Sequence, residues 1–411
     1  MGGKETVNKL NNYAIFTVCN LAYLPKALVL AESVIKHNNI KLNIYIIDKK
    51  VPIDIDTSDA NIYWIEEIKI PNFYELAFKY DIIELSTSLK PFITLKLLKR
   101  FEKVIYFDSD TCLYHSVDPI INDLDKYSII LTPHYTTPQS SDFSESDTGM
   151  MRFGSFNLGF YAVRNSEQGF NFLKWWSDRC VQFSFMETQF GLSTDQKWVS
   201  IAPCFFQDYH VSFNLGYNVA PWNSYERFLD KNEKGSYIVN GIFPLIFFHF
   251  SNFDKDDLEY LNKRSTYEKN LKRPDLYELG VAYYRVLSRK TSNVTLTKYA
   301  FDYMSGGEYI SPTLRRAYAC ILKELPANHD PFDSKGVVGV FAKKNHLFEK
   351  YNIPYKAKGY SNLNEYGYVL NIIYILLRFV LRFIGPNRFY NLSRLLVYLS
   401  SYRQNRGLWK Y

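Results

Sequence analysis

Two aspartates follow a short apolar run and could bind a metal ion. The segment VIYFDSD places Asp108 and Asp110 one residue apart, directly after residues 104–107. The carboxylates of such an Asp-x-Asp pair can reach the same hard cation. Mg²⁺ and Mn²⁺ favour these oxygen ligands and commonly share them with substrate phosphates. The alternative is that Asp108 caps the end of a strand and Asp110 the next turn, and the pair alone does not decide between the two.

The segments around this pair alternate between strand and helix patterns. Residues 13–18 (YAIFTV) and 42–48 (LNIYIID) have strand-like composition, and residues 20–38 between them have the apolar spacing of a helix. A strand, a helix and a strand in this order predict a parallel sheet in an α/β fold. We therefore expect Asp108 and Asp110 at the carboxyl end of a central strand, where open α/β sheets bind ligands.

The segments on either side of this strand carry their own signals. Ser88 and Pro91 suit the N-cap and first turn of a helix that leads into the aspartate strand. Residues 136–155 are rich in Ser, Asp, Thr and Gly and lack periodicity, which predicts a long loop. This loop is either a lid that orders over a substrate or an ordinary surface loop.

The chain is too long for one typical core. Its 411 residues predict a large domain with additions. We expect a catalytic domain over residues 1–262, because beyond about residue 260 the pattern becomes helical. Residues 263–367 form the expected helical extension, and residues 368–411 form a basic tail.

Charge argues against a nucleic-acid-binding protein, and cysteine usage indicates a reducing compartment. The formal charge of the chain is +7, and residues 368–411 contain seven Arg and Lys and no Asp or Glu. Residues 1–367 therefore sum to zero, which argues against a nucleic-acid-binding surface. The five cysteines lack CxxC spacing and cannot all pair, and the N-terminus has no apolar signal sequence. These features predict a cytoplasmic protein in a reducing compartment.

Four motifs in a fixed order give the sequence a family resemblance. They are KPFITLKLLKRFEKVIYFDSD, FNLGFYAV, TDQKW and FFHFS. In this order they resemble the nucleotide-sugar-binding domain of GT-A glycosyltransferases over roughly residues 12–255. The closest resemblance is to the retaining enzymes of family eight, the glycogenin and lipopolysaccharide galactosyltransferase group. It implies a GT-A fold, a mostly parallel Rossmann-like sheet flanked by helices.

The resemblance implies a metal site. In the family, the Asp-x-Asp carboxylates hold Mn²⁺ against the diphosphate of a UDP-sugar, which maps onto Asp108 and Asp110. A late histidine completes the site, and His249 is the matching position. Histidine suits Mn²⁺, although Mg²⁺ is the alternative ion. A lone histidine in an aromatic strand is otherwise more often a buried core residue.

The resemblance also implies donor-binding residues. Asn157 and Gly159 match a segment that shapes the sugar pocket, where Asn can bond hydroxyls and Gly permits close backbone approach. Lys90 matches a basic residue directed at the nucleotide-sugar, and Thr17 and Asn20 are expected to contact the nucleotide. The alternatives are a strand with a bulge for the Asn-x-Gly segment and a plain helix-terminal lysine for Lys90.

Asp195 and Gln196 are the expected catalytic residues. They match the Asp-Gln of the family's acceptor-side motif, in which the aspartate contacts the donor sugar. The sequence then departs from the family, because Lys197 and Trp198 stand where many members have Asp and an apolar residue. The departure leaves the stereochemistry open: an Asp195 that deprotonates the acceptor would invert the anomeric centre.

The tail combines apolar and basic residues. Residues 368–384 contain Asn371, Arg378 and Arg382 on one narrow stripe of an otherwise apolar helix. The stretch is short for a transmembrane span and ends at Gly385-Pro386. It predicts an interfacial anchor for an anionic membrane, at the inner face of the plasma membrane. The alternative is a helical hairpin packed on the protein or in an oligomer interface.

These features predict a bacterial glycosyltransferase. The expected reaction moves a sugar from a nucleotide-sugar to a glycan or lipid-linked glycan of a surface polysaccharide, such as O-antigen, lipopolysaccharide or capsule. A sugar nucleotidyltransferase is one alternative, although the segment TVCNLAYLPK lacks the Gly-rich basic loop of that class. An inactive relative that scaffolds a membrane assembly complex is the other. A homo-oligomer is a further expectation.

Overall fold

The structure is a computed structural model. It describes residues 12–138, 147–254, 273–290, 298–349, 367–401 and 406–409. The chain divides into two compact units. The first unit comprises Met1–Phe73 and Ile82–Ala300, and the second comprises Tyr74–Asp81 and Phe301–Tyr411.

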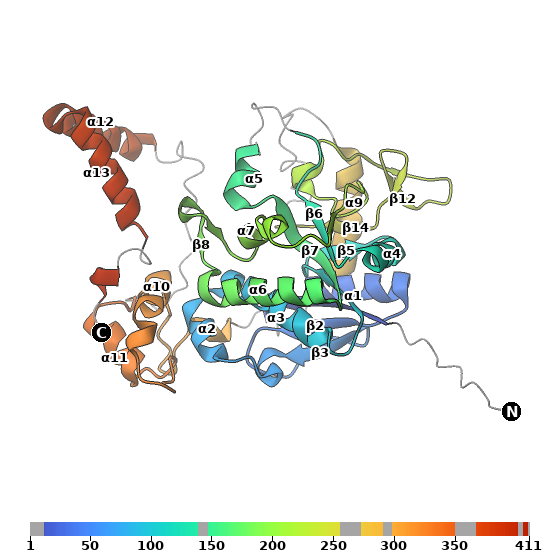
Figure 1. Ribbon diagram of the computed structural model, residues 1–411, viewed down its shortest axis with the longest axis horizontal. Coiled ribbons are helices and arrows are strands. Elements are labelled where there is room, and N and C mark those ends of the chain that lie inside the picture. Colours follow the sequence, from blue (N-terminus) through green and yellow to red (C-terminus); the bar gives the residue numbers. More distant parts are fainter. Residues whose placement is uncertain are drawn as a thin grey trace. The chain divides into compact units, whose positions relative to one another are not determined.

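A seven-stranded sheet forms the centre of the first unit, in the order β10-β6-β7-β4-β1-β2-β3 (Figure 1). Its strands are β1 (Tyr13–Cys19), β2 (Leu42–Ile46), β3 (Ala60–Trp64), β4 (Lys103–Phe107), β6 (Ile129–Pro133), β7 (Phe156–Arg164) and β10 (Tyr209–Val211). All neighbours pair in parallel except β7, which is antiparallel to both β4 and β6. The mostly parallel α/β sheet expected from the sequence is confirmed, with β4 at its middle.

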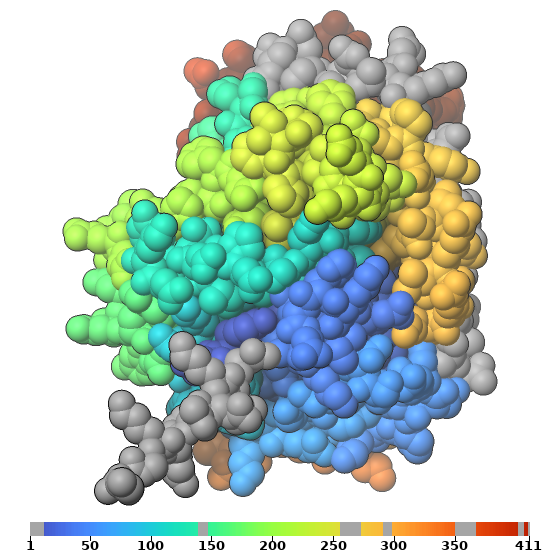
Figure 2. Space-filling model, turned by 90° about the vertical axis from the view of Figure 1, so that its right-hand side faces the viewer, coloured from blue at the N-terminus to red at the C-terminus, as the bar shows by residue number. Residues whose placement is uncertain are grey.

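Helices follow the strands along the first unit. They are α1 (Leu24–Asn38), α3 (Ile82–Leu97), α4 (Asp118–Lys126), α5 (Asp147–Phe153), α6 (Glu167–Phe183), α7 (Gln196–Val199) and α9 (Pro274–Leu287). The predicted β-α-β opening is confirmed, because α1 joins the parallel strands β1 and β2. Helices α3 and α6 pack on each other, and so do α1 and α9. In Figure 2, α9 (yellow-orange) covers the domain beside the segment that contains α1 (blue).

Short strands complete the first unit. They are β5 (Thr111–Leu113), β8 (Met186–Glu187), β9 (Leu192–Ser193), β11 (Leu229–Lys231), β12 (Tyr237–Val239), β13 (Phe243–Pro244) and β14 (Phe247–His249). Strands β5 and β14 pair only with each other among the described strands, in a two-stranded antiparallel sheet. Strand β5 follows the central strand β4 directly in the chain, and its pair with β14 carries much of the site.

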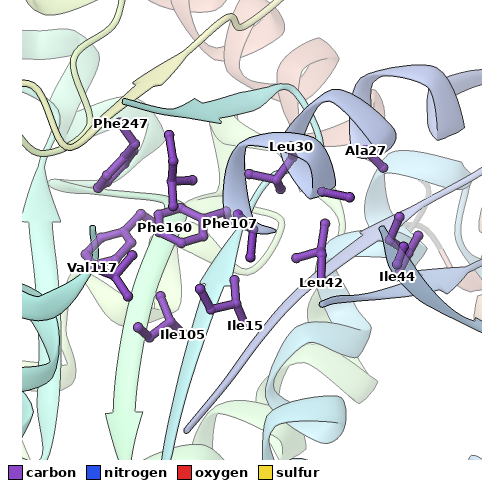
Figure 3. Close-up of a cluster of buried hydrophobic side chains, with 14 of the residues drawn as sticks. Ile15, Ala27, Leu30, Leu42, Ile44, Ile105, Phe107, Val117, Phe160 and Phe247 are labelled. Carbon is purple, nitrogen blue, oxygen red and sulfur yellow. The ribbon is translucent and has the colours of Figure 1, made fainter. Parts of the chain in front are cut away.

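The core fixes the end of β4. Phe107, the last residue of the strand, packs against Phe160 and Phe247, as Figure 3 shows. The ring centroids of Phe107 and Phe247 are 4.9 Å apart, and those of Phe160 and Phe247 are also 4.9 Å apart. Full burial of each such ring contributes roughly 1.5–3 kcal/mol. The residue that follows Phe107 is Asp108, so the packing holds the site from beneath.

The helix before β4 begins earlier than the sequence suggested. Helix α3 starts at Ile82, so Pro91 lies inside it and not in its first turn. Ser88 is no N-cap: its hydroxyl donates to the carbonyl of Leu85 within the helix, over 2.7 Å. Proline in a helix interior removes one backbone hydrogen bond. The helix continues through it because one face of α3 is buried against the sheet and α6.

Two predicted features fall partly or wholly outside the described residues. Of the expected loop at 136–155, residues 139–146 are not described, and α5 occupies its second half. The lid therefore stays a prediction. The expected boundary near residue 262 also lies outside the described residues. Helix α9, assigned to the helical extension, instead packs into the first unit through Leu276 and Tyr283, against Phe248 and Phe250.

The second unit is helical, as expected for the C-terminal region. It contains α2 (Phe73–Lys79), α10 (Pro312–Ile321), α11 (Val337–Lys344), α12 (Gly367–Ile384) and α13 (Pro386–Leu399). Arg315 on α10 is buried and donates to the carbonyls of Ala77, Phe78 and Tyr80 at the end of α2. An arginine thus satisfies the free carbonyls of a helix terminus.

Candidate active site

The two aspartates occupy the turn between β4 and β5. The amide of Asp108 donates to the carbonyl of Gly159 on β7 over 2.8 Å, which continues the sheet pairing by one residue. The amide of Thr111 then donates to the carbonyl of Asp108 over 3.1 Å and closes the turn. Asp108 and Asp110 therefore lie at the carboxyl end of the central strand, as the sequence predicted.

Strand pairing brings His249 to the aspartates. In the β5–β14 pair, His249 lies opposite Thr111, and the amide of Phe250 donates to the carbonyl of Asp110 over 2.8 Å. The Nε2 atom of His249 is 3.1 Å from Oδ1 of Asp110 and 3.8 Å from Oδ2 of Asp108. One ligand atom from each of the three side chains lies within 4.8 Å of the others. His249 is thus part of this cluster and not an isolated core histidine.

The cluster has the chemistry of a divalent cation site. Burial disfavours the charged form of His249, but Asp110 and Asp108 outweigh it and raise the pKa of the imidazole. Burial likewise opposes ionisation of Asp110, yet His249 holds the pKa of that carboxyl below its usual range. The two carboxylates thus favour a positive charge beside them, and a divalent cation held by the three side chains would supply one. Two carboxylates and one imidazole suit Mn²⁺, and Mg²⁺ would bind mainly through the oxygens.

Gly159 makes room for the histidine. A Cβ atom at Gly159 would lie 2.3 Å from Cε1 and 2.6 Å from Nδ1 of His249. Real Cβ atoms do not approach other heavy atoms so closely. The sequence indicated that a glycine here permits close approach of the backbone, and in the structure the approaching group is the imidazole.

Asn157 belongs to a buried polar network. Its Oδ1 accepts from the amide of Gly159 at 3.1 Å and from Nδ2 of Asn218 at 3.0 Å. Its Nδ2 lies 3.4 Å from Nε2 of His134, whose Nδ1 is 3.3 Å from the carbonyl of Ser155. Burial lowers the pKa of His134 to about 4, so the ring is neutral, donates to Ser155 and accepts from Asn157. One amide hydrogen of Asn157 remains for a ligand.

Lys90 connects the metal cluster to Asp195. Its Nζ is 3.3 Å from Oδ1 of Asp108 and 3.2 Å from Oδ2 of Asp195, and it donates to the carbonyl of Leu158 at 3.0 Å. Burial favours the neutral amine, but the two carboxylates outweigh it and raise the pKa of Lys90. The side chain is 4% exposed. A plain helix-terminal lysine is therefore excluded.

Asp195 is buried behind this lysine. The residue is 2% exposed, and burial raises the pKa of its carboxyl, with Lys90 opposing and Asp108 adding to the shift. The hydroxyl of Thr194 donates to Oδ1 of Asp195 at 3.1 Å. Thr194 has a φ of 46°, a left-handed conformation that is unusual for a β-branched residue. Such strain is concentrated at functional sites.

Gln196 and Lys90 bind the backbone of the same residue, Leu158. Its Oε1 accepts from the amide of Leu158 at 3.3 Å, and its Nε2 donates to the carbonyl of Phe153 at 3.1 Å. Lys90 binds the carbonyl of Leu158, so the peptide groups on both sides of that residue are fixed. The predicted FNLG and TDQKW motifs therefore support one another in space.

A cavity of about 510 Å³ borders these residues, within the size range of small-molecule sites. Its walls combine neutral polar and apolar side chains, including His134, Asn157, Thr194, Gln196, Trp222 and Asn252. Three of these residues were not predicted from the sequence. Trp222 and His134 carry no motif. Asn252 has a left-handed φ of 54° three residues after His249, a position where Asn is common.

Residues 14–169 match the model of the family described as Glycosyl transferase family 8. This part of the chain is a glycosyltransferase domain, and it resembles family eight. The matched segment of the glycosyltransferase domain contains Lys90, Asp108, Asp110, Asn157 and Gly159. Asp195, Gln196 and His249 lie beyond it and join the site through the contacts described above.

Two uncharacterised proteins of Bacillus subtilis (strain 168) resemble the domain in sequence. YfnD is 27% identical over 194 residues, which cover 46% of this chain and 60% of YfnD. YfnF is 25% identical over 176 residues, which cover 42% of this chain and 58% of YfnF. The similarity thus spans about six tenths of the length of these relatives.

Solved glycosyltransferase structures are distantly similar. The galactosyltransferase LgtC, in complex with donor and acceptor sugar analogues, has a TM-score of 0.41 at 15% identity, covering 68% of this chain and 96% of LgtC. GlyE of Streptococcus pneumoniae TIGR4 has a TM-score of 0.37 at 15% identity, covering 67% of this chain and 63% of GlyE.

Thr17 and Asn20, the two residues predicted to contact the nucleotide, are not among the residues that line the cavity. Thr17 on β1 is buried, and its hydroxyl has no hydrogen-bond partner among the described residues. Asn20 uses its side chain to accept from the amide of Tyr23 at 3.1 Å, which caps the short turn Leu21–Tyr23. Their contacts with a nucleotide stay predictions.

Proposed function

We propose that the protein is a metal-dependent glycosyltransferase. It moves a sugar from a UDP-linked nucleotide-sugar to a glycan acceptor. The product is a bacterial surface polysaccharide such as O-antigen, lipopolysaccharide or capsule. The observation that carries the proposal is the cluster of Asp108, Asp110 and His249, whose two aspartates lie in the segment that matches family 8. The cavity lined by Asn157 and Gln196, whose walls carry neutral polar and apolar side chains, would take the sugar.

The charged side chains of the site would support this reaction by holding a metal ion and a carboxylate in fixed positions. Asp108, Asp110 and His249 would hold Mn²⁺ or Mg²⁺, which when bound stabilises negative charge on a departing diphosphate. The Lys90 ammonium fixes the carboxylate of Asp108 through the 3.3 Å contact. Preorganised charges of this kind cost no reorganisation when the glycosidic bond breaks through an oxocarbenium-like transition state.

The position of Asp195 favours retention of the anomeric configuration. A general base must come within hydrogen-bond reach of the acceptor hydroxyl. Asp195 is 2% exposed, is paired with Lys90 at 3.2 Å and is not among the cavity-lining residues. Its geometry suits orientation of Lys90 and the donor, whereas Gln196 lines the cavity itself. We therefore assign positioning to Asp195 and contact with the sugar to Gln196.

Replacement of both aspartates tests the proposal. Asp108→Ala with Asp110→Ala should lower Mn²⁺-dependent hydrolysis of the best UDP-sugar about a thousandfold, because two of the three metal ligands are lost. The matched control replaces two exposed carboxylates of α6, Glu167→Ala with Asp178→Ala, and should keep wild-type activity. Hydrolysis is measured by release of UDP in a screen of nucleotide-sugars.

Two outcomes would contradict this proposal. Undiminished hydrolysis in the aspartate variant would overturn the metal site. A wild-type protein that binds no nucleotide-sugar in the presence of Mn²⁺ or Mg²⁺ would favour the inactive scaffold. Once a donor and an acceptor are known, the anomeric configuration of the product, measured by NMR, tests retention.

The tail supports a second part of the proposal, which is attachment to a membrane. Helices α12 and α13 have no buried residues, and large apolar side chains such as Ile375, Phe379, Phe383 and Leu396 are exposed. Helix α12 is also long and apolar enough to cross a membrane, with a mean hydropathy of 1.8. Because Arg378 and Arg382 interrupt it, we propose peripheral binding to an anionic inner membrane surface. A lipid-linked glycan is the acceptor that such a location supports.

A further inference from the structure

Among the described residues, the Lys26 ammonium has no anionic partner at ion-pair distance. Lys26 lies in the first turn of α1, and its Nζ is 4.4 Å from the ring centroid of Tyr23. No ion pair or hydrogen bond of the Lys26 ammonium is found among the described residues. A cation–π contact at a partly exposed ring contributes only about 0.5–1 kcal/mol. The contact with Tyr23 therefore leaves the hydrogen-bonding capacity of the ammonium unused.

Lys26 nevertheless lies near the site, because its helix α1 packs on β5, the strand that begins directly after Asp110. Partial burial lowers the pKa of its ammonium, and the carboxylate of Asp110 opposes that shift. Asp110 does not need Lys26 as its counter-ion, because His249 already contacts that carboxylate at 3.1 Å. Lys90, in contrast to Lys26, is fully paired, because its ammonium contacts two carboxylates and one carbonyl oxygen.

A second donor near Asp110 is also unpaired. Tyr283 on α9 is 2% exposed, and its hydroxyl has no hydrogen-bond partner among the described residues. Burial raises the pKa of this phenol, and Asp110 adds to the shift. Helix α9 packs on α1, and the ring of Tyr283 stacks on that of Phe250 with centroids 3.8 Å apart, next to the Phe250 amide that donates to the carbonyl of Asp110 over 2.8 Å.

The charge balance of the site calls for this cation. Asp108, Asp110 and Asp195 carry three negative charges, which Lys90 and a bound divalent cation would balance. A nucleotide-sugar brings two further negative charges on its diphosphate, and the leaving nucleoside diphosphate gains a third. Without Lys26 the diphosphate would meet no net positive charge from these groups.

We propose that Lys26 binds the diphosphate of the nucleotide-sugar donor, with the Tyr283 hydroxyl as a further donor to it. The ammonium would contact a phosphate oxygen and supply positive charge from the first turn of α1. This assignment rests on the proposed glycosyltransferase function and deepens it. It makes Lys26 a donor-binding residue that no motif in the sequence indicated.

Nucleotide binding by three lysine variants tests this assignment. Lys26→Met removes the charge and keeps a side chain of similar length, whereas Lys26→Arg keeps the charge. The control, Lys36→Met, replaces an exposed lysine at the other end of the same helix. Calorimetry with UDP in the presence of Mn²⁺, and with GDP in parallel, should show about tenfold weaker binding for Lys26→Met. Lys26→Arg should stay within about threefold of wild type and Lys36→Met should match it.

Uridine and the metal alone separate binding from folding. Uridine has no phosphate, so its affinity should be the same in Lys26→Met and in the wild type. Affinity for Mn²⁺ alone, measured by electron paramagnetic resonance, should be unchanged or higher in Lys26→Met, because a nearby positive charge is removed. Tyr283→Phe should weaken UDP binding by about threefold, the effect of one neutral hydrogen bond.

Several results would overturn the assignment. Equal losses for UDP and uridine would mean that Lys26 only supports the fold around Tyr23. Wild-type affinity for UDP in Lys26→Met, in a protein whose wild type binds UDP with Mn²⁺, would reject Lys26 alone and leave the proposed function intact. Failure of the wild type to bind any nucleotide would overturn both.

Discussion

At the scale of single residues, buried charges hold distant parts of the site together. Lys90 on α3 contacts Asp108 after β4, Asp195 before α7 and the carbonyl of Leu158 on β7. Each of these partners comes from a different motif of the sequence. Removing one partner of a buried ion pair leaves an uncompensated charge, at a cost of about 3–5 kcal/mol. The site therefore depends on Lys90 for its shape as well as its charge.

Gly159 offers a test of the metal site that alters none of its ligands. Gly159→Ala should weaken Mn²⁺ binding at least about tenfold, because the new Cβ lies 2.3 Å from Cε1 of His249 and must displace the ring. The control is Gly367→Ala, whose Cβ meets no atom within 4 Å. Titration of Mn²⁺ followed by electron paramagnetic resonance measures both. Wild-type affinity in Gly159→Ala would show that the imidazole is not a ligand.

At the scale of elements, sheet pairing explains what the sequence could and could not predict. The periodicity of residues 13–48 predicted the β-α-β opening, and the apolar run before Asp108 predicted the central strand. His249 and Asp195 were found only through the order of family motifs, because the β5–β14 pairing and the burial of Asp195 are tertiary features. No local pattern marks Trp222, His134 or Lys26, whose roles arise from contacts between segments far apart in the chain.

Packing also overrode one local rule. Pro91 suggested the beginning of a helix, since proline lacks the N–H that a helix interior uses. In the structure, α3 runs nine residues before it, and Leu85, Leu89 and Ile93 are buried on its core face. Burial of these side chains outweighs the lost hydrogen bond, so the helix begins well before the proline.

The attachment of α9 to the first unit predicts a dependence of stability on pH. Arg273 is 3% exposed and pairs with Asp275 at the start of α9, over 2.6 Å between Nη2 and Oδ2. Burial opposes ionisation of Asp275, but Arg273 outweighs it and holds the pKa of the carboxyl below its usual range. This pair therefore stabilises the fold above the unfolded-state pKa of an aspartate. The contribution is lost as the pH falls through the lower pKa of the folded state.

Asp275→Asn tests this dependence. The variant should lower the free energy of unfolding at pH 7 by about 3 kcal/mol, because the buried Arg273 loses its counter-ion. Its stability should also fall less steeply than that of the wild type in the acid range. Urea denaturation at a series of pH values measures both effects, with the exposed Asp178→Asn on α6 as the control. Parallel curves for the wild type and Asp275→Asn would refute the argument.

At the scale of the whole molecule, the charge of the chain is concentrated at one end. The formal charge of +7 equals that of residues 368–411, so the first 367 residues are neutral in sum. The same residues expose apolar side chains along α12 and α13. A nucleic-acid ligand would not require those apolar side chains, whereas an anionic lipid surface would contact both kinds of group.

Deletion of the chain from residue 368 tests this membrane contact. The full chain should sediment with liposomes that contain anionic lipid and bind neutral liposomes more weakly, whereas the truncated chain should remain in solution. Arg378→Gln with Arg382→Gln should weaken binding to anionic liposomes about thirtyfold, since each basic residue near such a surface contributes about 1 kcal/mol. Binding of UDP by the truncated chain in the presence of Mn²⁺ serves as the control for folding. If truncation leaves sedimentation unchanged but converts an oligomer to a monomer in analytical ultracentrifugation, the apolar faces of α12 and α13 join copies of the chain and the membrane proposal is wrong.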